Sequence, residues 1–401
     1  MSRRLIDHSS DLKRLQTEGY EVRIKEGFLL ISSVPYLDRA GQLRHGVLAC
    51  ELTQQGSRAG APSNHTIWWQ GEYPCRRDGS QIGGLYNPTA GKDLFKGFAA
   101  NHFFSARPSH PGAPATGYSN YYDKIITYIG IISAPALALY PGSTARTERV
   151  FPDEEENSPF IYPDTNSSRA EINVISDKLR GLRIAIVGLG GTGSYILDFV
   201  TKTLVAEIHL FDDDVFGQHN AFRAPGAASL MELDAKMKKV DYYHRIYSKM
   251  RTGIFAHDVR LSRDTFHTLT GFSFVFIAID KGVLKKALFD FLTAQGTPFI
   301  DVGMGILRVG NALRGTLRVT TGTPEMNQHL IKRVSMIDND GDDDYGTNIQ
   351  IAEANALNAA LAVLRWKKLF GFYIDPDSEY HSQFSLDEQI IFNADYPPSV
   401  C

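Results

Sequence analysis

The sequence predicts an α/β protein with a mostly parallel sheet, preceded by a smaller α+β domain. From residue 166 onward, short apolar runs alternate with segments of helical period, an order typical of parallel sheets covered on both faces. A glycine-rich turn at 188–193 joins one of these runs to a helix-like segment. Residues 1–145 instead show strand patterns between loops dense in Gly and Pro, as in an α+β domain.

Length and composition limit the classes of protein. The 401 residues, 43 % of them hydrophobic, are enough for a large core and two or three domains. A net charge of -3 and a pI near 6.5 give no basic field for nucleic acid or an anionic membrane. Cys50, Cys75 and Cys401 are too widely spaced to indicate a disulfide framework or a zinc site. Without a signal peptide or a membrane-length apolar run, we expect a cytoplasmic protein.

The first domain, residues 1–145, begins with a short helix around Leu12 and Leu15. Its many aromatic side chains favour an aromatic core over a ligand site, and the apolar run at 125–140 is expected to be a buried element. His45, His65 and His102 lie on separate elements and predict no metal site. Strands are expected at 21–24, 28–31, 45–52 and 65–70.

Residues 146–165 form a predicted linker, acidic at 153–156 and rich in Pro and Gly. The second domain, 166–401, continues with βα alternation and changes to antiparallel patterns near its end. Helices are expected at 172–179, 195–203, 229–250, 282–295 and 353–369, and strands at 184–187, 208–211, 272–279, 298–302 and 312–321.

The glycine turn follows the strand at 184–187 directly. Gly188, Gly190 and Gly193 occupy the G-x-G-x-x-G positions, and Gly191 lies between them. The first glycine permits a tight turn, the second lets phosphates approach the backbone, and the third lets helix and strand pack closely. The helix that follows directs free N–H groups and its positive dipole end at the phosphates.

Polar residues after the next strand separate two interpretations of this turn. Asp212 alone would hold the ribose of a dinucleotide, as in an NAD-dependent dehydrogenase. The additional polar groups fit a triphosphate better, because cations neutralise phosphate charge and a carboxylate at a strand end can bind Mg²⁺. These further residues are Asp214, Asn220, Arg223, Lys236 and Asp280.

In this order and spacing, these residues resemble the ATP site of the ThiF/MoeB/ubiquitin-activating-enzyme adenylation family, of the bacterial ubiquitin-like conjugation type. The resemblance covers about 166–322, with departures at Ala224 and Lys281. It implies a Rossmann-like fold, ATP and Mg²⁺ as cofactors, and adenylation of the C-terminal carboxylate of a ubiquitin-like protein. It further implies a conjugating-enzyme-like acceptor.

The resemblance also assigns roles to single residues. Asp212 would bind ribose, Asp214 would belong to the same nucleotide site, and Asp280 would bind Mg²⁺. Asn220, Arg223 and Lys236 would hold the phosphates. Arg169 would enter the ATP site of a partner subunit, which implies a homodimer.

The family's downstream catalytic cysteine is missing, since no Cys lies between Arg76 and Val400. The enzyme therefore hands the adenylate to a partner's nucleophile, forms an oxyester on Ser335 or Thr347, or uses Cys75 in trans. The first domain resembles a module that precedes such domains in bacterial operons for ubiquitin-like proteins, which implies binding of the substrate or the next acceptor. The alternatives are adenylation of a sulfur carrier or small peptide, a dehydrogenase, and an inactive scaffold.

Overall fold

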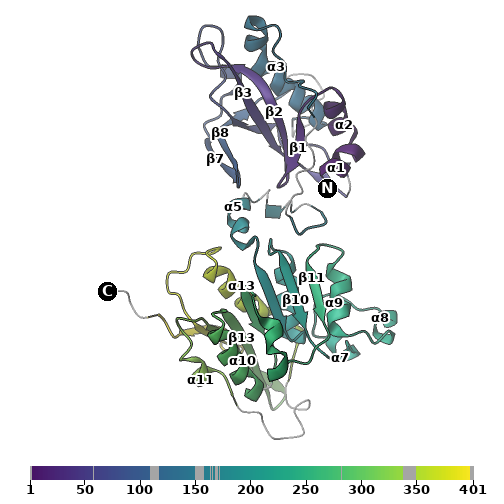
Figure 1. The fold of residues 1–401 in the computed structure, drawn as a ribbon, viewed down its shortest axis with the longest axis vertical. Helices are drawn as coiled ribbons and strands as arrows, with labels where there is room; N and C mark the ends of the chain where they lie inside the picture. The colour runs from purple at the N-terminus through teal and green to yellow at the C-terminus, as the bar shows by residue number, and fades with distance from the viewer. Residues whose placement is uncertain are drawn as a thin grey trace. The chain divides into compact units, whose positions relative to one another are not determined.

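The computed structural model describes residues 2–56, 58–108, 117–149, 158–162, 164, 166, 167, 170, 172–280, 282–336 and 349–397. The chain divides into two compact units, one of residues 1–158 and 162–177, the other of residues 159–161 and 178–401. Figure 1 colours the first unit from purple to teal and the second from teal to yellow. The expected linker at 146–165 includes 150–157, which lie outside the described residues, so its limits stay a prediction.

The first unit is built on a six-stranded antiparallel sheet in the order β1-β2-β3-β6-β8-β7. The four strands expected from the sequence are present, and β2 extends six residues beyond its expected end. The structure adds β7 and β8, whose sequence lacks a clean alternation of polar and apolar residues. The elements are α1 Ser2–His8, α2 Ser10–Thr17, β1 Val22–Lys25, β2 Phe28–Leu37, β3 Leu43–Glu51, β4 Gln54–Gln55, β5 Arg58–Ala59, β6 Thr66–Gln70, η1 Gly83–Leu85, β7 Ala90–Phe95, β8 Phe98–Ser105, α3 Tyr121–Leu139 and α5 Asn173–Ser176.

Helix α3 is the main core helix of this unit. It is long and apolar enough to cross a membrane by length and composition. Its buried face, which includes Tyr121, Ile125 and Tyr128, packs instead into one hydrophobic cluster with Trp69 and Phe104 of the sheet. The expected buried element and the aromatic core are therefore both confirmed.

The second unit contains an eight-stranded sheet in the order β11-β10-β9-β12-β13-β14-β15-β16. Strands β11 to β13 in this order pair in parallel, and β14, β15 and β16 add antiparallel strands at one edge. This arrangement confirms the α/β class with a mostly parallel sheet.

Helices cover both faces of this sheet (Figure 1). Residues of α6, α9 and α13 pack against one face, and residues of α10 and η3 against the other. The elements are η2 Asp177–Leu179, β9 Arg183–Val187, α6 Gly191–Thr201, β10 Glu207–Phe211, α7 Gln218–Ala221, α8 Leu230–Asp234, α9 Lys239–Tyr247, β11 Ile254–His257, η3 Arg263–Leu269, β12 Phe274–Ile277, α10 Gly282–Ala294, β13 Phe299–Val309, β14 Ala312–Gly322, α11 Leu330–Arg333, α13 Ala352–Leu369, β15 His381–Ser385 and β16 Ile390–Ala394.

The continuous helix expected at 229–250 is wrong, because the structure interrupts it between α8 and α9. Lys236 has a positive φ of 46°, and Lys238 is extended. Lys238 forms a β-bridge with Val215, and the Phe216 N–H donates to the Met237 carbonyl at 2.8 Å. Pairing with a distant segment thus overrides the local helical period, and Lys239 becomes the first residue of α9.

Candidate active site

The strand order of the second sheet indicates a candidate ligand site at the carboxyl ends of its central strands. Strands β10 and β12 lie on opposite sides of β9, so the connections that leave the carboxyl ends of β9 and β12 run in opposite directions. In open α/β sheets, ligands bind at the carboxyl ends of strands at such a switch point. The glycine turn follows β9 there, and the Ala278 N–H donates to the Val187 carbonyl at 2.8 Å.

Each glycine of the turn meets a different surrounding. Gly188 has a φ of 87°, and a Cβ at Gly193 would lie 1.9 Å from the Gly188 carbonyl oxygen. A Cβ at Gly191 would lie 2.3 Å from the Asn355 amide of α13. A Cβ at Gly190 would meet nothing within 4 Å. Three glycines therefore serve chain packing, while the backbone at Gly190 faces open space at the N-cap of α6, where a phosphate could approach.

Asp212 organises the turn from the end of β10. Its Oδ2 accepts the Leu189 N–H at 2.6 Å, and its Oδ1 accepts the Asp214 N–H at 2.9 Å. The side chain is only 7 % exposed, and burial raises the pKa of this carboxyl, although Lys239 and the two N–H groups lower it. Asp214 is 57 % exposed, so its carboxylate is the more accessible of the pair for a ribose hydroxyl.

The buried cation beside these carboxylates is Lys239, which the sequence analysis passed over. Its Nζ lies 2.6 Å from Asp214 Oδ2 and 3.4 Å from Asp212 Oδ1, and the residue is 6 % exposed. Lys236, the residue expected there, is exposed and stands at the turn between α8 and α9. Because the interruption of the helix starts α9 at Lys239, sequence periodicity alone could not identify this lysine.

Asn220 and Arg223 each present a buried donor without an acceptor among the described residues. Asn220 is 2 % exposed and accepts the Gly217 N–H at 2.9 Å through Oδ1. Its Nδ2 and the Nε of Arg223 are buried, and within the described part of the chain neither has a hydrogen-bond partner. Buried polar groups are almost always paired, so these two orphaned donors, three residues apart in the sequence, are suited to an anionic or carbonyl ligand.

Asp280 lies three residues beyond the end of β12 and two before the start of α10. Its side chain is exposed, so its carboxylate is accessible to a cation. Among the described residues, no group of three or more His, Cys, Asp or Glu could hold a metal. A cation here would therefore depend on Asp280 together with oxygens of a bound ligand, a donor set that suits Mg²⁺.

Other predicted residues fall outside the described ones or in different surroundings. Arg169, Lys281, Thr347 and Cys401 lie outside the described residues. Ser335 is exposed after α11. Cys75 belongs to the first unit, where it is 2 % exposed and its Sγ donates to the Tyr73 carbonyl at 3.3 Å. Burial raises the pKa of the Cys75 thiol, which disfavours the reactive thiolate.

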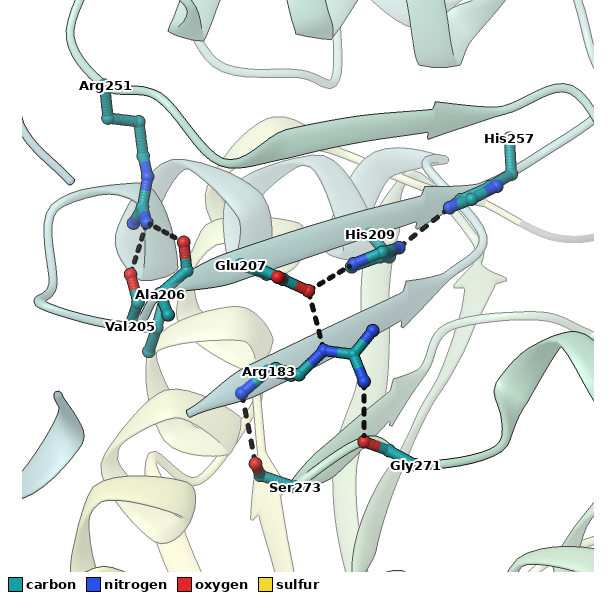
Figure 2. A network of polar contacts seen from close by, with 9 residues as sticks. All are labelled: Arg183, Val205, Ala206, Glu207, His209, Arg251, His257, Gly271 and Ser273. Carbon is teal, nitrogen blue, oxygen red and sulfur yellow. Dashed lines mark hydrogen bonds and ion pairs between the residues drawn. The ribbon is translucent and has the colours of Figure 1, made fainter. Parts of the chain in front are cut away.

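A polar network supports the strands that carry the site (Figure 2). Arg183 donates to Glu207 at 2.6 Å, and Glu207 Oε2 lies 3.0 Å from His209 Nε2. His209 Nδ1 lies 2.9 Å from His257 Nε2, so one ring must donate and the other accept. Burial lowers the pKa of both histidines, which agrees with a neutral pair.

Arg251 anchors the far end of α6 in the same view (Figure 2). It is fully buried, and it donates to the carbonyls of Thr203 at 3.1 Å, Ala206 at 3.4 Å and Val205. These carbonyls lie in the connection from α6 to β10. The guanidinium therefore fixes the helix whose opposite end begins at the glycine turn.

Comparison with known proteins identifies both parts of the chain. Residues 168–353 match the ThiF family, and residues 10–165 match a domain of unknown function, DUF6791. No curated protein matches the sequence. One similar solved structure is that of Escherichia coli MccB with MccA-N7isoASN, with a TM-score of 0.46 and 18 % identity. The match covers 57 % of this chain and 68 % of the MccB chain. The structure of Escherichia coli MccB with ATP has a TM-score of 0.44 and 17 % identity, with the same coverage of both chains. PaaA has a TM-score of 0.43 and 16 % identity, over 55 % of this chain and 75 % of the PaaA chain.

Proposed function

Because residues 168–353 form a ThiF-family domain, we propose that this protein is an ATP-dependent adenylating enzyme that activates the carboxylate of a peptide or protein. The pair of buried, orphaned donors on Asn220 and Arg223 carries the proposal. An unsatisfied buried donor costs about 1–3 kcal/mol, and phosphate oxygens would offset that cost.

Different groups of the chain would bind different parts of the nucleotide. The open backbone at Gly190 and the N-terminal end of α6 face the phosphates, and Asn220 and Arg223 donate to them. Asp214 accepts from the ribose because it is the exposed carboxylate, while Asp212 keeps the turn in place. Lys239, already paired with Asp214, supplies the positive charge beside them.

Asp280 would hold Mg²⁺, which when bound neutralises charge on the phosphate oxygens. The exposed carboxylate three residues after the end of β12 fits this role.

The reaction follows from positioning and charge. A carboxylate oxygen of the substrate attacks the α-phosphorus, the new O–P bond gives the acyl-adenylate, and the bond to pyrophosphate breaks. Such nucleotidyl transfers need no covalent nucleophile from the enzyme. Removing one donor to the developing charge costs roughly 100- to 1,000-fold in rate, so Arg223→Ala should abolish measurable ATP–pyrophosphate exchange. Asp280→Ala should abolish it as well, because it removes the carboxylate that would hold Mg²⁺.

The substrate we propose is the C-terminus of a ubiquitin-like protein, and a sulfur carrier or short peptide is the alternative. Exchange can be measured with a ubiquitin-fold protein that ends in free glycine, with the same protein amidated at its C-terminus, and with its isolated tail peptide. Exchange with the free protein alone supports the proposal. Exchange with the tail peptide at equal rate favours the peptide alternative, and exchange with the amidated form contradicts carboxylate activation.

The next step is transfer of the adenylate to a conjugating-enzyme-like partner. The buried thiol of Cys75 argues against a thioester at that residue. The exposed hydroxyl of Ser335 is the alternative acceptor, as an oxyester. Intact mass after incubation with ATP and substrate separates the routes: no adduct supports hand-off, and an adduct released rapidly by neutral hydroxylamine would indicate a thioester.

We propose that the working unit is a homodimer in which Arg169 enters the partner's ATP site. The proposal rests on the resemblance of the sequence, because Arg169 lies outside the described residues. A strictly monomeric mass by light scattering at micromolar concentration would remove Arg169 from the site.

A further inference from the structure

A buried carboxylate next to the candidate site holds two cations. Asp301 of β13 is 0 % exposed, and Arg318 of β14 donates to its Oδ2 at 2.6 Å. Lys285 of α10, only 6 % exposed, lies 2.9 Å from its Oδ1. Asp301 Oδ1 accepts no aligned hydrogen bond, so the contact from Lys285 is an ion pair. One cation is enough to neutralise the Asp301 carboxylate, so the second cation gives the cluster a net positive charge.

The two cations occupy different places in the fold. Arg318 reaches Asp301 across Gly303, where a Cβ would lie 2.4 Å from its Nη2, so its contact stays within the β13–β14 pair. Lys285 stands at the end of the first turn of α10, five residues after Asp280. A lysine is unfavourable at the positive end of a helix dipole, so the contact with Asp301 must offset that cost.

Asp301 therefore touches both flanks of the segment that carries Asp280. Its backbone is the parallel partner of Ile277, the last residue of β12. Its side chain pairs with Lys285 beyond Asp280. A single buried residue thus fixes the chain three residues before and five residues after Asp280.

We propose that Lys285 and Asp301 are positioning residues that hold Asp280 in place for its cation. This inference rests on the proposed function, in which Asp280 binds Mg²⁺ beside ATP. The clamp fixes the described segments on both sides of Asp280, so its carboxylate meets the cation without an added cost of ordering. Loss of a group that orients a metal ligand typically weakens metal binding about 10- to 100-fold.

The test compares two variants that each leave Asp301 one cation. Lys285→Met cuts the clamp and keeps Arg318, and Arg318→Met keeps the clamp and serves as the matched control. Mn²⁺ is titrated into each full-length protein with ATP present and followed by electron paramagnetic resonance. We expect Lys285→Met to weaken Mn²⁺ binding about tenfold, Lys285→Arg to restore it, and Arg318→Met to leave it unchanged. Equal losses in the two Met variants, or none in Lys285→Met, would overturn the clamp.

A second measurement separates this inference from the proposed function. Hydrogen exchange of the β12–α10 connection is followed without nucleotide in the same variants. The clamp predicts faster exchange in Lys285→Met alone. If wild type binds no Mn²⁺ with ATP, the proposed function fails, and equal exchange in both Met variants refutes the clamp independently.

Discussion

Arg251 offers a direct test of how the far end of α6 is held. Its guanidinium is fully buried and donates to five carbonyls, those of Thr201, Thr203, Val205, Ala206 and Thr252. Arg251→Met keeps the volume of the stem but leaves these oxygens without a donor. Each buried unsatisfied group costs about 1–3 kcal/mol.

The full sum overstates the effect, because the variant also avoids burying a charge. Burial lowers the pKa of the Arg251 guanidinium to about 10, which reflects that cost. We therefore expect a net loss of about 3 kcal/mol, near the upper end of the range for losing a hydrogen bond to a charged group. In a unit of this size, that loss lowers the Tm of the second unit by on the order of 10 °C.

Differential scanning calorimetry of the full chain measures this change. The control is Arg245→Met on α9, the helix that precedes Arg251, where the side chain is 50 % exposed and pairs with Glu232, so the loss should stay below about 1 kcal/mol. Arg251→Lys retains the charge with fewer donors and should fall between wild type and Arg251→Met. Equal melting temperatures for Arg251→Met and Arg245→Met would refute the reasoning.

Three further predictions concern the site and its surroundings. Gly190→Ala should fold normally, because its Cβ meets nothing within 4 Å, but it should weaken ATP binding. Gly193→Ala should instead lower the Tm, because its Cβ would lie 1.9 Å from a carbonyl oxygen. Calorimetry measures both the binding and the Tm. Lys239→Met leaves the buried Asp212 without its cation and should lower both the free energy of unfolding, by about 3–5 kcal/mol, and the affinity for ATP. Burial, with Arg333 and Arg318, lowers the pKa of His381 to about 4, so the unfolded chain alone takes up this proton below about pH 6.5. His381 should therefore leave stability unaffected above that pH and lower it by about 3 kcal/mol as the pH drops to 4. In urea unfolding across this range, His381→Gln should remove this part of the slope, and buried histidines such as His209 and His257 should keep their own part.

The sequence predicts the βαβ unit well because its signals are local. The apolar run before Gly188, the glycine spacing and Asp212 at the end of the next strand lie within thirty residues and do not depend on distant contacts. The structure shows β9, α6 and β10 in that order, and Asp212 hydrogen-bonded to the turn.

The failures come from contacts between distant segments. The period at 229–250 is helical, yet the β-bridge between Val215 and Lys238 breaks it and brings Lys239 to the carboxylates. Strands β15 and β16 escaped prediction because β15 is polar and gains its place by pairing with β14. In the sequence, Asp301 is an ordinary residue of a predicted strand. Only the structure shows that Lys285 and Arg318 both pair with its carboxylate.

The central claim is that the glycine turn serves a triphosphate and not a dinucleotide. Isothermal titration calorimetry of the full-length protein with ATP and Mg²⁺, and separately with NAD, tests it most directly, with Arg223→Met as the variant that removes one orphaned donor. We predict that wild type binds ATP, that Arg223→Met binds it more weakly, and that NAD gives no heat of binding. Binding of NAD without ATP would indicate a dehydrogenase, and binding of neither would indicate a scaffold; either result would contradict the account.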